Sequence, residues 1–216
     1  MRVVSLIASS TEIVCALGLE DSLVGRSHEC DFPSSVKNLP VCTEPLIDPR
    51  RSSAEIDRQV KDILREALSV YRVDRGVLEA LQPDVIITQS QCEVCAVSLR
   101  DVEGALAGWL DSRPRVVSLE PMCLADVWTD MRRVADALGV SERGKRLVER
   151  LRHRVTEIAD RAQALEHSPT VACIEWIDPL MAAGNWVPEL VDLAGGINLF
   201  GEVGKHSPWM TFEQLC

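Results

Sequence analysis

The residues from 141 to 166 carry the longest helical pattern in this chain, and that pattern restricts what the rest can fold into. Apolar side chains recur there at heptad-like spacing and line one side. They are Leu147, Leu151, Val155, Ile158, Ala162 and Leu165. At about 1.5 Å per residue such a helix is roughly 39 Å long, so it is predicted to be a structural spine. A second predicted helix, over 124–138, precedes it and ends at Gly139.

Strand-like and helical segments alternate before the spine. The apolar runs that suit strands lie at 3–7, 23–25, 85–88 and 115–119. Helical patterns between them cover 9–17, 52–71, 76–81 and 98–110. The first two of these helices open with the predicted capping boxes Ser9–Glu12 and Ser52–Glu55, and the apolar face of the second is expected to lie on a core. Residues 34–51 are rich in turn-forming residues. This order predicts an α/β fold, with a mostly parallel sheet covered by helices.

A second α/β block is predicted after the spine. The run Val171–Ile174 is typical of a buried strand, and a helix over 188–194 has proline in its first turn and stops at Gly195. A last capping box runs from Thr211 to Gln214. The expected domains are an N-terminal α/β lobe at 1–123, a helical linker at 124–167 and a partial C-terminal α/β lobe at 168–216.

The composition is that of an ordinary globular protein, with 46% hydrophobic and 26% charged residues. The net charge of −10 repels phosphate backbones, so nucleic acid is not expected as a partner. No run approaches the ~20 apolar residues of a membrane span. The N-terminus lacks a signal-peptide pattern, and eight cysteines without a small-scaffold spacing suit a reducing compartment. As written, the chain is predicted to be cytoplasmic; an export signal upstream would place it in the periplasm or cell envelope.

Several segments resemble one known family, the helical-backbone solute-binding proteins that serve ABC importers. The opening RVVSLIASSTEIVCALGLEDSLVGRS is similar to the family's first strand, helix and strand. Later segments follow in the family's order, namely LQPDVIITQ, VACIEWIDPLMAAGNWVPELVDLAGGINLFGE and SPWMTFEQL. The similarity runs from residue 2 to 215. The combination of RSHECDFP, SAEID, QSQCEVCAVS, EWIDP and GNWVPELVDLAGG resembles the cobalamin-binding subgroup.

The resemblance implies two Rossmann-like lobes joined by one long helix, with a ligand in the cleft between them. The ligand would be a corrinoid such as cobalamin, which the lobes hand to the permease subunits of an ABC importer. No cofactor is required, and a monomer is expected. Family members usually extend past the last capping box, so the second lobe is expected to be incomplete here.

Two other functions stay open from the sequence. The same fold would also suit an iron chelate or haem, and a cytoplasmic metal or redox protein would use Cys92 and Cys95. The sequence has no P-loop, G-x-S-x-G or H-E-x-x-H motif, and no G-x-G-x-x-G after a strand. The chain is therefore predicted to bind rather than to catalyse.

Ligands of open α/β sheets bind at the loops that follow the strands. Four loops qualify, at 7–10, 28–32, 89–96 and 176–186. From the N-terminal lobe we expect ligand contacts from Ser9, Ser10, His28, Glu29, Cys30, Gln89, Cys92 and Cys95. His28 either faces the ligand, where a ring nitrogen approaches cobalt, or belongs to a solvated turn.

Five of the nine aromatic residues are tryptophans. A corrinoid is flat, apolar in its middle and rimmed with amides, so its site needs aromatic walls. Trp176, Trp186 and Trp209 are the predicted walls, and the resemblance places Trp209 at the family's aromatic position. The alternative is that these tryptophans fill the core of the second lobe.

The C-x-x-C loop, Cys92-Glu93-Val94-Cys95, admits three roles. It holds the loop in shape or faces the ligand, it binds a soft metal together with Cys30 or His28, or it forms a redox disulfide.

Glu213 follows the predicted cap Thr211, where the helix N-terminus stabilises a carboxylate. The resemblance makes Glu213 a residue that docks onto arginines of the permease. Glu93 and Glu103 are the candidates for the matching contact from the first lobe.

Overall fold

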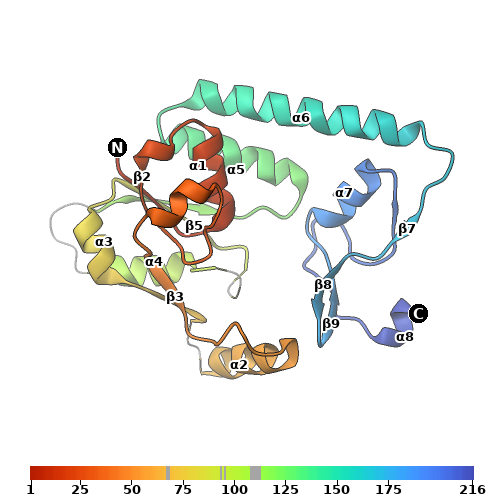
Figure 1. The fold of residues 1–216 in the computed structure, drawn as a ribbon, viewed down its shortest axis with the longest axis horizontal. Coiled ribbons are helices and arrows are strands. Elements are labelled where there is room, and N and C mark those ends of the chain that lie inside the picture. The colour runs from red at the N-terminus through yellow and green to blue at the C-terminus, as the bar shows by residue number, and fades with distance from the viewer. Residues whose placement is uncertain (67–68, 93, 95, 108–112) are drawn as a thin grey trace.

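A parallel sheet forms the centre of the N-terminal part. The computed structural model describes residues 1–66, 69–92, 94, 96–107 and 113–216. The sheet has four strands, in the order β2 (Leu23–Arg26), β1 (Val3–Ser5), β5 (Val85–Gln89) and β6 (Arg115–Leu119), and every neighbouring pair is parallel (Figure 1). The predicted α/β fold with a parallel sheet is confirmed.

Helices cover both faces of this sheet, because successive side chains of a strand point to opposite faces. Val3 and Ile87 pack into one apolar cluster with α1 (Ala8–Ala16), α5 (Leu124–Ala137) and the start of α6 (Ser141–Gln163). Val4 and Ile86 pack into a second cluster with α3 (Arg75–Leu81) and α4 (Leu99–Leu106). All four of these strand residues are fully or almost fully buried. We call residues 1–123 the N-terminal lobe.

An antiparallel pair of strands projects from this lobe and carries α2 (Ser53–Arg65). Its strands are β3 (Thr43–Pro45) and β4 (Tyr71–Val73), and the short helices η1 (Glu20–Ser22) and η2 (Ser34–Asn38) precede it. The apolar face of α2 was expected to lie on a core, but no residue of α2 is buried. Val60 and Ile63 are only half-buried beside the second cluster. The reason is that α2 sits at the end of a two-stranded ribbon and not over the main sheet.

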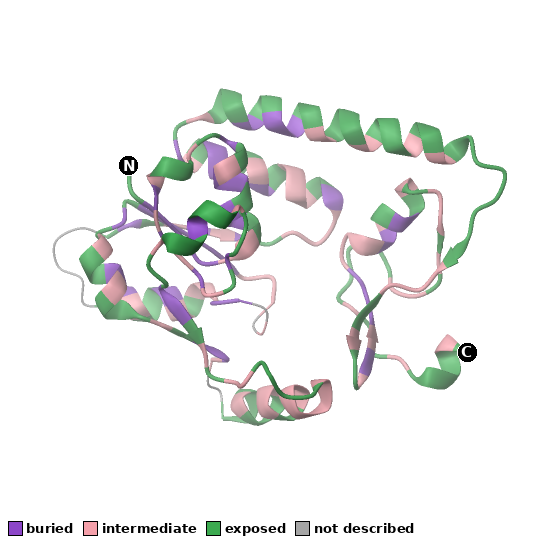
Figure 2. Cartoon of the chain, in the orientation of Figure 1, coloured by how far each residue is buried: buried purple, intermediate pink, exposed green. Residues whose placement is uncertain are grey.

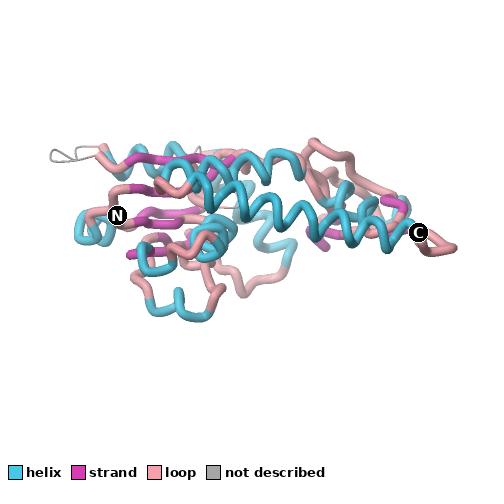
Figure 3. Tube along the Cα trace, turned by 90° about the horizontal axis from the view of Figure 1, so that it is seen from above, coloured by secondary structure: helices cyan, strands magenta, loops and turns pink. Residues whose placement is uncertain are grey.

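The predicted spine is confirmed as α6, which ends three residues before the expected bound. Gly139 has φ +71°, a left-handed conformation that lets the chain reverse between α5 and α6. Gly144 allows the two helices to pack closely, because a Cβ atom there would lie 2.4 Å from Cβ of Ala135. Figures 1 and 3 show α6 passing from the N-terminal lobe to the remainder of the chain.

The segment 168–216, which we call the C-terminal block, consists of short elements. They are β7 (Thr170–Val171), β8 (Ile174–Ile177), β9 (Leu180–Ala182), α7 (Val187–Leu193), β10 (Ile197–Asn198) and α8 (Phe212–Leu215). The expectation of one buried strand over 171–174 is wrong. Val171 pairs parallel with Asn198, whereas Ile174 pairs antiparallel with Ala182, so the run divides between two sheets and is not buried.

Two of the three predicted capping boxes are confirmed, at the start of α2 and of α8. Pro188 lies in the first turn of α7, as expected. The box at Ser9 is wrong, because α1 begins at Ala8 without a side-chain cap. The Ser10 hydroxyl is turned inward, where it bonds to the Ser5 hydroxyl at 2.5 Å. In the part of the chain that the structure describes, no helix has the length and apolar character needed to span a bilayer.

Candidate functional site

The carboxyl ends of the four parallel strands meet at one edge of the sheet, which is where α/β proteins bind ligands. Figures 1 and 3 show these strands running toward the C-terminal block. Glu189 of α7 reaches this edge, since its carboxylate accepts a hydrogen bond of 2.9 Å from the backbone N–H of Leu124, just beyond β6. The strand-end loops therefore face the C-terminal block, as a site between two lobes requires.

A buried hydroxyl network lies beneath the first loop. Thr11 donates to the Ser5 hydroxyl at 2.7 Å and lies 3.0 Å from the Cys30 sulfur. Ser5, Ser10, Thr11 and Cys30 are all fully buried. Burial raises the pKa of the Cys30 thiol, and this effect outweighs the lowering by the Thr11 hydrogen bond and by Arg26. Ser10 and Cys30 thus support the loop from inside, while Ser9 is exposed on its surface.

His28 is the polar side chain of this edge whose hydrogen bonding is most specific. Its Nδ1 lies 2.8 Å from the Thr43 hydroxyl, and that hydroxyl donates its own proton to Ser27 at 3.1 Å. This direction assigns the ring proton to Nδ1 and leaves the lone pair on Nε2. Burial lowers the pKa of His28, so its ring is neutral at pH 7. The side chain is 23% exposed, and Nε2 lies 3.8 Å from the Glu29 carboxylate.

Arg26 contacts the loop that carries His28, and Tyr71 lies against the His28 ring. The Arg26 guanidinium donates to the carbonyls of Ser27 at 3.0 Å and Cys30 at 3.1 Å, so it fixes the loop on both sides of the histidine. The Tyr71 ring lies 5.5 Å from the His28 ring, centroid to centroid. Burial raises the pKa of Tyr71 to about 12, so it is a neutral neighbour.

The loop after β5 is braced by Gln89. The Gln89 side chain accepts from the backbone N–H of Cys92 at 2.9 Å and donates to its carbonyl. Gln89 is buried, so it shapes the loop from within. Cys92 is disulfide-bonded. Cys95 and Glu93 lie outside the described residues. Among the described residues no group of three or more histidine, cysteine or acidic side chains is placed to hold a metal ion.

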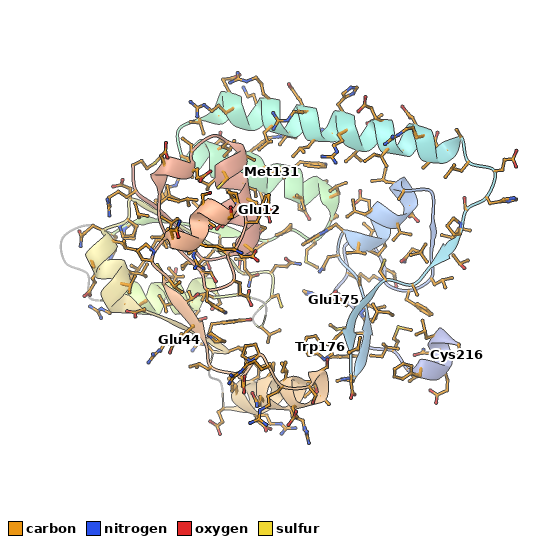
Figure 4. All side chains as sticks on the ribbon, viewed as in Figure 1. Glu12, Glu44, Met131, Glu175, Trp176 and Cys216 are labelled. Atoms are coloured by element: carbon orange, nitrogen blue, oxygen red, sulfur yellow. The ribbon has the colours of Figure 1, made fainter. Side chains whose placement is uncertain are left out.

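The tryptophans of the C-terminal block differ in setting. Trp209 is 56% exposed, and its backbone forms an isolated antiparallel β-bridge with Met181 of β9. The Lys61 ammonium of α2 lies over the Trp209 ring, 5.4 Å from the ring centroid. Trp176 is half-buried and donates to the Asp178 carbonyl at 2.9 Å. Figure 4 shows it at the lower end of the β8–β9 hairpin, on the side of α2. Trp186 is half-buried at the start of α7.

A cavity of about 490 Å³ lies away from the strand ends, between the C-terminal half of α6 and α7. Ala162 and Gly195 are among its lining residues. The predicted ligand residues do not line it.

Comparison with known families decides the class of this molecule. A family described as periplasmic binding protein matches residues 3–215. The chain belongs to the periplasmic binding protein family. Such proteins are non-enzymatic transport receptors, the solute-binding components of ABC importers, so the prediction of a binder is confirmed.

Solved periplasmic binding proteins share the fold at low identity. The periplasmic vitamin B12 binding protein BtuF of Vibrio cholerae is 18% identical, with a TM-score of 0.68 over 99% of this chain and 71% of its own. The periplasmic heme-binding protein RhuT from Roseiflexus is 23% identical, with a TM-score of 0.68 over 99% and 72%. A possible iron-binding protein from Staphylococcus epidermidis is 17% identical, with a TM-score of 0.70 over 99% and 72%. No curated protein sequence matches the chain.

The glutamates predicted to dock this periplasmic binding protein onto its permease are surface residues where the structure describes them. Glu213 is exposed on α8, and hydrogen bonds from its own backbone N–H and from Thr211 lower its pKa. Glu103 is exposed on α4.

Sequence reasoning missed Thr43, Tyr71, Arg26 and Lys61. Thr43 and Tyr71 stand 15 and 43 positions from His28 and carry no local pattern that points to it. Arg26 gave the one usable signal, since a charged residue that ends a buried strand needs several acceptors.

Proposed function

We propose that this periplasmic binding protein captures a corrinoid, a cobalamin-like ligand, between its lobes for an ABC importer. The observation that carries the proposal is His28. Its neutral ring is held through Nδ1 and presents the Nε2 lone pair at the edge where the parallel strands end. Imidazole nitrogens with this kind of second hydrogen bond are common ligands of transition metals.

The remaining wall of the site would come from exposed and half-buried side chains. On the C-terminal block, Trp176 is part of β8 and Trp209 pairs with Met181 of β9, and both side chains suit the apolar face of a flat macrocycle. On the N-terminal lobe, Ser9 and Glu29 are exposed and suit the amide rim. Ser10, Cys30 and Gln89 would act by holding the loops in place, because they are buried.

Haem is the second candidate ligand, because the same histidine would also ligate iron. The vitamin B12 and heme-binding relatives match with equal TM-scores, so the likeness favours neither ligand. The subgroup motifs, RSHECDFP above all, favour the corrinoid.

Titration with three ligands tests the proposal. Aquacobalamin, cyanocobalamin and haemin are each added to the purified protein, and heat and visible absorbance are recorded. Aquacobalamin should bind with an absorbance change, because Nε2 of His28 replaces its water. Cyanocobalamin should bind without that change, because cyanide already holds the position. His28→Ala should abolish the absorbance change and weaken aquacobalamin alone, whereas the control His153→Ala, an exposed residue of α6, should leave both unchanged.

Each other result has a distinct meaning. If only haemin binds, the ligand is an iron tetrapyrrole and not a corrinoid. Binding of no tetrapyrrole at all would refute the proposal. If a corrinoid binds and His28→Ala has no effect, the proposed ligand stands but His28 does not contact it.

Glu213 and Glu103 are proposed to contact the permease from the two lobes. Glu213→Lys should then weaken the complex with the reconstituted importer while the ligand affinity of the isolated protein stays the same. A change in ligand affinity would contradict the docking role.

A further inference from the structure

The spine helix α6 is a basic element in an acidic chain. It holds seven arginines and lysines against four acidic residues, whereas the whole chain holds 23 against 33. All seven basic residues of α6 are exposed. Figure 2 shows the outer side of the helix exposed along its whole length, on one long edge of the molecule. Positive charge is therefore concentrated on that edge.

Five of these residues share one side of the helix, because positions three, four and seven apart on an α-helix lie on the same side. They are Arg143, Arg146, Arg150, Arg154 and Arg161, and we call them the arginine ridge. From first to last the ridge is roughly 27 Å long, at about 1.5 Å per residue. The acidic residues Glu142, Glu149 and Asp160 follow a separate line on the same helix, and Glu157 is the one acidic residue of α6 on the side of the ridge.

Most of the ridge makes no contact ion pair in the part of the chain that the structure describes. Arg146, Arg150 and Arg154 form no ion pair within the described residues. The acidic neighbours have other contacts, since Glu142 pairs with Lys145 at 2.6 Å and the Glu157 carboxylate lies 3.5 Å from Nε2 of His153. The guanidinium groups of the ridge are thus free to meet an external anion.

A basic recess lies beside one end of the ridge. Its volume is about 300 Å³, and its lining includes Arg143, Arg146 and Arg150 together with the end of α1 and the two residues that follow it. Arg143 donates to the carbonyls of Leu17 and Gly18 at 3.2 and 3.3 Å, which fixes this end of the ridge against the N-terminal lobe.

We propose that the arginine ridge binds the anionic headgroups of a phospholipid bilayer, so that the protein lies on a membrane along α6. The planar guanidinium fork matches a phosphate with two parallel hydrogen bonds. Basic residues near an anionic leaflet are attracted to it without any apolar insertion. This surface is separate from the ligand site and from the residues proposed to contact the permease.

The shape of the ridge favours a bilayer over an acidic protein. Protein interfaces centre on apolar side chains, and the ridge is flanked by charged residues. The apolar side of α6 is packed at its N-terminal end, where Leu147 and Val148 are buried against the N-terminal lobe, and Ile158, 37% exposed, is the one large apolar side chain of α6 that is exposed. A flat array of anions can contact a straight ridge over its full length, whereas a curved nucleic acid duplex would touch only part of it.

The overall negative charge of the chain does not oppose this contact at close range. At physiological salt the Debye length is about 8 Å, so exposed charges farther away are largely screened. The charges that count are those of the contacting edge, where basic residues outnumber acidic ones.

Vesicle sedimentation tests the proposal on the full chain. The vesicles contain either phosphatidylcholine alone or equal parts of phosphatidylcholine and phosphatidylglycerol. The test variant is Arg146→Gln with Arg150→Gln, on the ridge. The matched control is Lys145→Gln with Arg152→Gln, which removes the same charge from the opposite flank of α6. A duplex DNA at equal phosphate concentration is the third arm.

The protein should bind the anionic vesicles only, and added salt should release it. At roughly fivefold per basic residue near an anionic surface, the ridge variant should bind about 25-fold more weakly, and the flank variant should bind nearly as well as the parent. If both variants lose the same affinity for anionic vesicles, the binding depends only on net charge, and the proposed role of the ridge is wrong. If the protein binds DNA more tightly than vesicles, and the ridge variant loses that binding, the partner of the ridge is nucleic acid and not a bilayer. No binding to anionic vesicles would refute the proposal.

Discussion

The N-terminal lobe and the C-terminal block are built from the same kinds of elements, but they bury their apolar side chains to different extents. In the N-terminal lobe two apolar clusters fill both faces of a four-stranded sheet. In the C-terminal block the strands pair only two by two, and several large apolar side chains are exposed. These include Ile174, Ile177, Ile197, Leu199, Trp209 and Phe212. Figure 2 shows the contrast between the two regions.

This difference shows what local signals can and cannot provide. Capping residues and glycine turns shape the C-terminal block as they shape the N-terminal lobe. Apolar side chains of a sheet are buried only where other elements pack on its faces. The two-stranded pairs β7–β10 and β8–β9 offer little surface for such packing. We therefore expect substitutions in the N-terminal lobe to act mainly on stability, and those in the C-terminal block to act mainly on binding.

The largest contrast is expected between two isoleucines. Ile86 is fully buried in the central sheet, so Ile86→Ala should lower the free energy of unfolding by about 2–5 kcal/mol. Ile177 is 65% exposed, so Ile177→Ala should change it by less than about 0.5 kcal/mol. Urea unfolding of both variants measures the difference. Equal losses would mean that the exposed apolar surface of the C-terminal block is covered in solution.

Trp209→Ala sharpens the comparison on the binding side. If Trp209 stacks on a flat ligand, its loss should cost roughly 1–3 kcal/mol, judged by base–aromatic stacking, which is about ten- to hundredfold in affinity. The free energy of unfolding should stay the same, because the side chain is 56% exposed. Calorimetry and urea unfolding check the two quantities. Unchanged affinity for every corrinoid tested would remove Trp209 from the site, and a loss of folding would make it a core residue.

The pH dependence of ligand binding tests the role proposed for His28 on the N-terminal lobe. Protonation of Nε2 removes its lone pair, so affinity for aquacobalamin should be constant above pH ~6.5 and fall as the pH decreases below it. Burial lowers the folded pKa, so the fall should begin below the ordinary value of histidine. By linkage, this group's contribution to stability is also fully present above pH ~6.5 and is lost as the pH falls toward the folded pKa. The His28→Ala protein should show a flat affinity profile over the same range.

The smallest expected effect is that of ligand binding on the relative arrangement of the two regions. One stiff helix connects them, with further contact between Glu189 and the start of α5. Scattering profiles recorded with and without ligand should therefore be nearly superimposable. A large compaction on binding would show that α6 does not hold the two regions apart.

Much of the fold follows from short-range patterns. The apolar spacing of α6, the capping box at Ser52 and the strand Val85–Gln89 can all be predicted, because each depends on residues within one or two turns or one strand. The division of the run 171–174 between two sheets could not be predicted. It depends on pairing with Asn198 on one side and Ala182 on the other, which lie in separate later strands.

The candidate site shows the same limit. The position of His28 after a strand predicts that it lies at the carboxyl edge of the sheet, and the structure has it just beyond β2. The proton on its Nδ1 depends on Thr43, and Thr43 reaches it only because β3 folds back beside that loop. The buried settings of Ser10 and Cys30 come from the fold and not from their polarity, so sequence position alone could not separate supporting residues from exposed ones.

The polypeptide crosses between the two regions once, through α6, and in the described residues no sheet takes strands from both sides of it. A single recombination point within α6 would therefore exchange one entire region between related genes without dividing a sheet. The histidine-bearing wall would be inherited as one unit and the tryptophan-bearing wall as another. New ligand preferences could then arise by shuffling existing walls, with the helix as the common joint.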